Sequence, residues 1–175
     1  PDNQTLYVRL EVDETGCYAT TTQDLIVNPI PTVLVGPTYE VCDDDYDGIG
    51  SYDLSTLDET LLDGQTGVSI SYYESQEDAD NATNVLDVNY QNTVPDNQTL
   101  YVRLEVDETG CYATTTQDLI VHPLPEIIVP TPLEECDDDY DGIVSFFDLS
   151  QKTEEILNGQ TGISVSYYET LFNLS

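Results

Sequence analysis

The sequence predicts an all-β protein made of tandem β-sandwich modules, each with a short helical insertion and an acidic calcium loop. Three observations lead to this prediction: a repeat with a period of 94 residues, segments in which apolar and polar residues alternate, and one cluster of aspartates in each repeat. A period of this length exceeds a solenoid unit and suits one small sandwich domain.

The repeat defines the predicted domains. Residues 1–27 recur without a change at 95–121, and CDDDYDGI at 42–49 recurs at 136–143. The offset then grows to 95, because the second copy carries one inserted residue near 144–147. Proline-containing joints lie at 28–31 (NPIP) and 122–125 (HPLP), where proline favours stiff, extended backbone. We therefore expect the C-terminal hairpin of a preceding repeat at 1–29, a complete repeat at 30–123, and the N-terminal part of a following repeat at 124–175, all cut from a longer array.

The closing hairpin of the repeat has the clearest strand pattern. Within 99–106, one face carries Leu100, Val102, Leu104 and Val106, and the other carries Tyr101, Arg103 and Glu105. This alternation indicates a half-buried strand, and the turn at 107–110 leads into a second strand at 112–121. Shorter segments at 32–35, 49–54, 68–74 and 86–90 are further candidates. About six strands in one repeat favour an immunoglobulin-like sandwich.

A short helix is predicted at about 56–63. Ser55 is the expected capping residue, Asp58 occupies the third helical position, and Gly64 stands where a helix ends. A second helical turn is expected after Ser75.

The composition excludes several classes of partner. The chain has 35 acidic and three basic side chains, for a formal net charge of −32. The charge therefore excludes a basic groove for nucleic acid and argues against docking on an anionic membrane. No apolar run has the length of a membrane span, and no basic-plus-apolar signal segment is present. Hydrophobic residues still make up 39 %, which is enough for small cores.

The aspartate cluster predicts a calcium site. Asp43, Asp45 and Asp47 occupy positions 1, 3 and 5 of a loop whose sixth residue is Gly48, as at the start of an EF-hand loop. Glycine permits the sharp turn that brings the backbone carbonyl of Ile49 to position 7. Crowded aspartates without a cation would repel one another, although a solvated acidic turn is the plain alternative.

The second copy predicts a second calcium ion, and each site needs a distal ligand. The expected ligands there are Asp137, Asp139, Asp141 and the carbonyl of Ile143. The proposed distal ligands are Asp53, at position 11 of its loop, and Asp148, at position 12. Because the flanking helices of an EF-hand are absent, we expect a calcium loop on a β scaffold.

Four cysteines suit an oxidising, extracellular setting, and none stands in a C-x-x-C pair that would favour zinc. One connectivity joins Cys42 to Cys111 within a module. Another joins Cys17 to Cys42 and Cys111 to Cys136 across the joints. Free thiols, or pairing to modules outside this sequence, remain open as well. The sequence favours Cys42–Cys111, because a bridge within the module lets each domain fold alone.

No catalytic constellation is present in the sequence. The chain has one histidine, His122, and the repeat places Asn28 at the equivalent position. Neither a nucleophile–base arrangement nor a glycine-rich phosphate loop is found. We therefore expect a protein that is not an enzyme. A hydrolase domain conflicts with the repeat itself.

The motifs together resemble a known kind of repeat. In order, they are a proline joint, E-x-C-D-D-D-x-D-G, F/Y-D-L-S, N/D-G-Q-T-G, S-Y-Y-E, Y-V-R-x-E and T-G-C-Y-x-T-T-T-x-D-L-I-V. This set resembles the tandem repeats of very large cell-surface, gliding-adhesin-like proteins of flavobacteria and related Bacteroidota. The resemblance implies export by the type IX secretion route, and a role as a stalk, filament or adhesin.

The expected function is therefore that of a structural or adhesive module on the cell surface, stabilised by Ca²⁺. Its expected partners are neighbouring repeats, laterally associated chains, and surface glycans or other cells. The alternative is an array of carbohydrate-binding modules attached to a secreted enzyme. That alternative requires solvent-facing aromatic side chains, for which Tyr72, Tyr73 and Tyr101 are the candidates.

Overall fold

The computed structural model describes residues 3–137, 142–144 and 146–170. The chain is predominantly β and forms two compact units, 1–123 and 124–175. Among the described residues, no helix is both long and apolar enough to cross a membrane.

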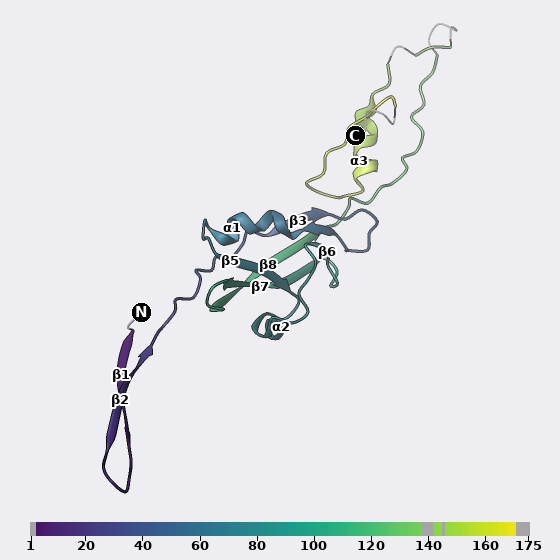
Figure 1. Cartoon of the computed structure of the whole chain (residues 1–175). Coiled ribbons are helices and arrows are strands. Elements are labelled where there is room, and N and C mark those ends of the chain that lie inside the picture. Colours follow the sequence, from purple (N-terminus) through teal and green to yellow (C-terminus); the bar gives the residue numbers. More distant parts are fainter. Residues whose placement is uncertain (1–2, 138–141, 145, 171–175) are drawn as a thin grey trace. The chain divides into compact units, whose positions relative to one another are not determined.

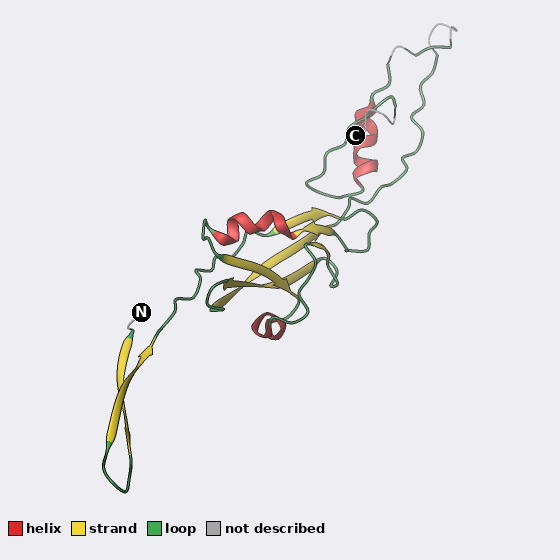
Figure 2. Ribbon diagram, viewed as in Figure 1, coloured by secondary structure: helices red, strands yellow, loops and turns green. Residues whose placement is uncertain are grey.

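The segment 30–123 contains two sheets (Figures 1 and 2). Its elements in chain order are β3 (Tyr39–Cys42), β4 (Ser51–Asp53), the 3-10 helix η1 (Leu54–Leu57), α1 (Asp58–Leu62), β5 (Val68–Tyr73), α2 (Gln76–Asn81), β6 (Asn89–Gln91), β7 (Asn97–Val106) and β8 (Tyr112–His122). The larger sheet has the strand order β3-β8-β7-β5, and β4 pairs with β6 in a smaller one. β3 runs parallel to β8, and the other described pairs are antiparallel.

The long strand β8 defines two ends of the sheet. At the end that we call the entrance pole, the turn at 107–111 precedes β8, and the N–H of Asp107 donates to the carbonyl of Gly67. The incoming chain passes the same end, where the N–H of Thr32 donates to Oε1 of Gln65 over 2.9 Å. At the opposite end, the exit pole, β3 ends at Cys42 beside His122, the last residue of β8.

One hydrophobic core lies within this segment. Leu100, Val102 and Leu104 of β7 are fully buried, as the alternation predicts. They belong to one cluster with Tyr52 of the smaller sheet and Leu61 of α1, so both sheets and the helix share the core. Every buried member of that cluster falls between residues 52 and 121, so the segment 30–123 encloses a core of its own.

The structure corrects two local predictions. Residues 32–35 form no strand, because the prolines around them leave a joint whose Thr32 N–H bonds a side chain instead of a ladder. The first strand of the segment 30–123 is the four-residue β3, which is too short to show an alternation of apolar and polar residues. The first helical turn is capped by Asp53, whose carboxylate accepts from the N–H of Ser55, and not by Ser55 itself. The prediction after Ser75 is confirmed: the Ser75 side chain caps α2.

The flanking segments expose side chains whose counterparts are buried. At the N-terminus, β1 (Gln4–Glu11) and β2 (Tyr18–Leu25) repeat the sequence and pairing of β7 and β8. Leu6 is 41 % exposed, whereas its counterpart Leu100 is fully buried. The second unit contains η2 (Leu149–Lys152) and α3 (Thr153–Leu157), and its Phe147 is 46 % exposed.

Candidate metal site and cysteine positions

The acidic loop at the exit pole is tied to the end of β8. The N–H of Asp43 donates to the carbonyl of His122 over 2.8 Å. The Asp43 carboxylate then organises the loop, because it accepts from the N–H of Tyr46 and from that of Gly48, each at 2.9 Å. Asp43 is only 6 % exposed, so its carboxylate lies inside the turn.

Three carboxylates converge in this loop. Asp43, Asp45 and Asp47 each offer an oxygen within 4.8 Å of the others, which is a spacing that one cation can bridge. Asp45 and Asp47 are exposed, so an ion can reach the group from solvent. These are the three side chains that the spacing in the sequence singles out.

The loop gives its carboxylates different electrostatic environments. Burial acts to raise the pKa of Asp43, but hydrogen bonds from backbone N–H groups of the loop outweigh it, so the pKa is lowered. The pKa of Asp45 is raised, by partial burial and by the neighbouring charge of Asp47. The two outer carboxylates therefore repel each other when both are ionised.

A buried asparagine clamps the back of the loop. Asn92 donates from Nδ2 to the carbonyl of Gly48 over 2.9 Å and accepts on Oδ1 from the N–H of Gly50 over 2.6 Å. Gly48 has φ +75°, and a Cβ there would lie 2.8 Å from the Asp96 carboxylate, so the position needs glycine. Sequence reasoning missed Asn92, because it follows its partners by more than 40 residues.

The proposed distal ligands have other roles. The carboxylate of Asp53 accepts from the N–H and the hydroxyl of Ser55, and Asp53 does not belong to the converging group. Asp148 makes the same two contacts with Ser150. The D-L-S motif at both positions is a helix cap, and the role of the two residues as distal ligands stays a prediction.

The structure describes Ile49 and two of the four ligands predicted in the second loop, Asp137 and Ile143. The N–H of Ile49 donates to Asp47 over 2.7 Å. In the second copy, Asp137 accepts from the N–H of Gly142 over 2.9 Å, which repeats the contact between Asp43 and Gly48. Ile143 is 69 % exposed. Asp139 and Asp141 lie outside the described residues.

The structure separates the two cysteines that the sequence favours as a bridge. Cys42 stands opposite His122, the last residue of β8, at the exit pole. Cys111 lies just before the first residue of β8 at the entrance pole, eleven residues before His122. At about 3.3 Å per residue they are about 35 Å apart, and a disulfide needs Cα atoms within about 7 Å. The fold therefore rules out Cys42–Cys111 within one repeat.

The alternative across the joints pairs cysteines from unlike poles. Cys17 occupies the turn between β1 and β2, so it is the entrance-pole cysteine of an earlier repeat, whereas Cys42 is at the exit pole of a later one. Pairing Cys17 with Cys42, or Cys111 with Cys136, would join the entrance pole of one repeat to the exit pole of the next. All four cysteines are free in this structure.

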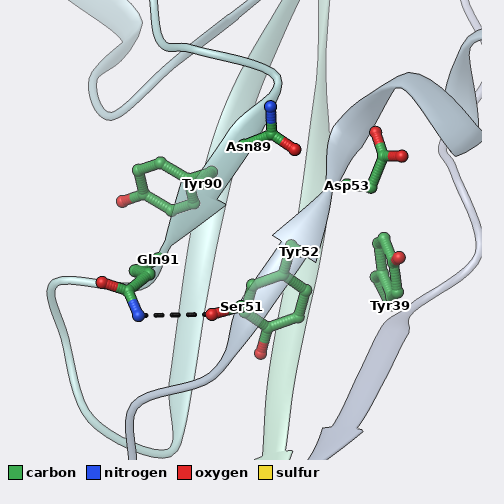
Figure 3. A pocket seen from close by; sticks show the side chains of 7 residues that line it. All are labelled: Tyr39, Ser51, Tyr52, Asp53, Asn89, Tyr90 and Gln91. Carbon is green, nitrogen blue, oxygen red and sulfur yellow. Dashed lines mark hydrogen bonds between the residues drawn. The ribbon is translucent and has the colours of Figure 1, made fainter.

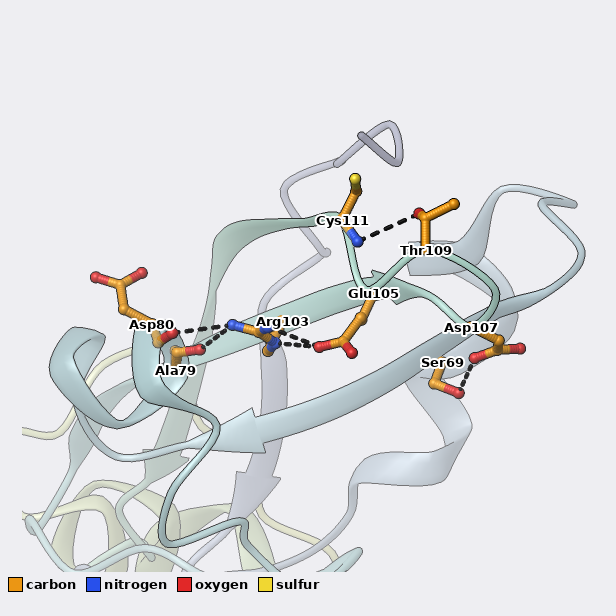
Figure 4. Close-up of polar contacts among 8 residues, drawn as sticks. All are labelled: Ser69, Ala79, Asp80, Arg103, Glu105, Asp107, Thr109 and Cys111. Atoms are coloured by element: carbon orange, nitrogen blue, oxygen red, sulfur yellow. Dashed lines mark hydrogen bonds and ion pairs between the residues drawn. The ribbon is translucent and has the colours of Figure 1, made fainter. Parts of the chain in front are cut away.

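The entrance pole contains a buried arginine that the sequence places on the solvent side. Arg103 is 8 % exposed and donates to the carbonyl of Ala79 over 2.9 Å and to that of Asp80 over 3.1 Å (Figure 4). It also forms two hydrogen bonds with Oε2 of Glu105. Figure 4 shows the Cys111 side chain projecting away from the hairpin turn beyond this network.

The tyrosines that the sequence offers for a sugar-binding platform do not all face solvent. Tyr72 is 3 % and Tyr73 is 1 % exposed, and the Tyr72 hydroxyl donates to Asp58 over 2.7 Å. A pocket at β4 and β6 is lined by Tyr39, Tyr52 and Tyr90 together with polar side chains, among which Gln91 donates to Ser51 over 3.2 Å (Figure 3). Two of the three aromatic candidates are thus core residues.

A family model described as "Flavobacterium inter-domain disulphide bond domain" matches residues 38–125 and again residues 132–174. The two matches divide the chain close to the joint at 122–125. No curated protein matches the chain.

Proposed function

Because this chain belongs to the Flavobacterium inter-domain disulphide bond domain family, we propose that it forms part of an extracellular array of calcium-stabilised, immunoglobulin-like repeats with a structural or adhesive role. The family accounts for the flavobacterial origin and for disulfides between domains. Export by the type IX route, the calcium ion and the adhesive role belong to the proposal. Two sheets that share one core support the sandwich, and the repeat supports the array.

The observation that carries the proposal is the convergence of Asp43, Asp45 and Asp47. Calcium prefers hard oxygen ligands, and this loop supplies three carboxylates within reach of one ion. The raised pKa of Asp45 points the same way, because its cause includes the nearby charge of Asp47, which a divalent cation would neutralise.

The position of the loop suggests what the ion does. The loop follows Cys42 directly and is bonded to the carbonyl of His122, immediately before the joint. An ion here would tie the end of β3 to the end of β8 at the point where one repeat leads into the next. We propose that calcium stabilises this end of the repeat and holds the joint at one geometry.

The expected size of the effect follows from mass action. Sites in extracellular modules bind calcium with dissociation constants of about 10⁻⁴ M. An ion that binds only the folded state adds roughly 2.7 kcal/mol of stability when its concentration is 100 times that constant. That is a large part of the roughly 5–15 kcal/mol that holds a domain folded.

Thermal unfolding of the chain in calcium and in EDTA at fixed ionic strength tests the proposal. We expect a higher melting temperature in calcium, and loss of most of that gain in Asp45→Asn. Asp44→Asn is the matched control, because Asp44 is a neighbouring exposed aspartate outside the converging group. Equal melting temperatures in calcium and EDTA, with magnesium and sodium also without effect, would show that the loop is only a solvated turn.

A further inference from the structure

The two cysteines of one repeat lie at its two ends. Cys42 is at the exit pole and is exposed, and Cys111 is at the entrance pole and is partly exposed. In a tandem array, the exit pole of one repeat leads through a short joint to the entrance pole of the next. Each joint therefore has one cysteine from either side.

One backbone carbonyl connects the two positions. Sγ of Cys111 lies 4.0 Å from the carbonyl oxygen of Asn28, in the joint that enters the repeat. The 94-residue period makes Asn28 the counterpart of His122 in the preceding repeat. The carbonyl of His122 accepts the N–H of Asp43, and Cys42 stands opposite His122 in the parallel ladder.

Applying the period to these contacts brings the two cysteines together. At each joint, one backbone carbonyl makes two contacts. It lies beside the sulfur of the entrance-pole cysteine of the following repeat. It also accepts a hydrogen bond from the N–H of the residue after the exit-pole cysteine of the preceding repeat. Neighbouring strands are about 4.8 Å apart, and a disulfide needs Cα atoms roughly 4.4–6.8 Å apart.

We infer that the exit-pole cysteine of each repeat, Cys42, forms a disulfide with the cysteine of the following repeat that corresponds to Cys111. By the same rule, Cys111 pairs with the exit-pole cysteine of the preceding repeat. This inference deepens the proposed function, since it rests on the tandem array, and it selects one connectivity among those that an inter-domain disulfide allows. The two connectivities predicted from the sequence are different. Neither joins the exit-pole cysteine of one repeat to the entrance-pole cysteine of the next.

The chemistry is an ordinary thiol–disulfide exchange. The two S–H groups lose their protons and one S–S bond forms between the sulfurs. A small-molecule disulfide accepts the two electrons and two protons and is reduced to two thiols. Both cysteines are accessible for this reaction, because neither is fully buried.

The test uses a chain of two tandem copies of residues 30–123, a segment that encloses its own core. One variant keeps only Cys42 of the first copy and Cys111 of the second, with serine at the other two positions. The reversed variant keeps only Cys111 of the first copy and Cys42 of the second. A third keeps both cysteines of the first copy. All three have two thiols and the same composition.

After equilibration with a glutathione redox buffer, we expect the first variant to lose both free thiols as a monomer, by thiol titration and intact mass. The other two should keep both. Retention of both thiols by a folded first variant, or bridging of the reversed variant, would overturn the inference. Alanine in place of serine provides a second set if a serine variant unfolds. Calcium is left out, so the result is independent of the metal site.

Discussion

The guanidinium group of Arg103 lies over the ring of Tyr112, with its central carbon 3.4 Å from the ring centroid. The same pair recurs in the first hairpin, where the central carbon of Arg9 lies 4.0 Å from the centre of the Tyr18 ring. The stack is therefore built into the hairpin sequence. The surroundings differ, because only Arg103 also donates hydrogen bonds to two carbonyls of α2.

This contrast predicts unequal effects of one substitution at two sites of identical sequence. Arg103→Lys removes the planar group that bonds two carbonyls and a carboxylate at once, which should lower the free energy of unfolding by about 1–3 kcal/mol. Arg9→Lys is the matched control, since the Arg9 side chain is 53 % exposed, and should change stability little. Urea unfolding of both variants measures this. Equal effects would mean that the carbonyls of α2 contribute nothing.

Gly36→Ala should destabilise the repeat through a steric clash. A Cβ at Gly36 would overlap Oε1 of Gln117, whose Nε2 donates to the carbonyl of Pro37 over 2.6 Å. Because Gln117 is fully buried, it has little room to move, and overpacking of this kind typically costs about 1–3 kcal/mol. The double variant Gly36→Ala, Gln117→Ala should lose less than the sum of the two single changes. Strictly additive losses in a double-mutant cycle would contradict this explanation.

Asp78 should contribute stability that disappears in acid. Hydrogen bonds from Ser75, Asn84 and Thr83 lower its pKa in the folded protein. A carboxyl whose pKa is lower when folded contributes fully above its unfolded pKa of about 3.9, and the contribution fades as the pH falls through the folded value. The melting temperature of Asp78→Asn should therefore lie below that of the unmodified chain at pH 7, and the gap should narrow below about pH 4. A gap that stays constant with pH would argue against this role.

The sequence predicted those features that depend on neighbouring residues. The alternation in 99–106 identified the buried face of β7, and the aspartate spacing identified the three carboxylates that converge. Contacts between distant segments were not predictable in this way. Arg103 follows the solvent-facing pattern of its strand, yet α2, more than 20 residues earlier, covers it. β3 is too short for a period, and its parallel pairing with β8 is what separates Cys42 from Cys111.

That parallel pairing has a consequence for a chain under tension. With the proposed bridges, a pulling force enters at Cys111, follows β8 and the joint, and leaves at Cys136, which is 25 residues later. Because β8 is already extended, this part of the chain can lengthen little under force. The residues between Cys42 and Cys111 are not part of the path that transmits the force. A reduced repeat can release its 94 residues, or roughly 300 Å of chain. An oxidised array should therefore act as a tether that hardly lengthens until a covalent bond breaks.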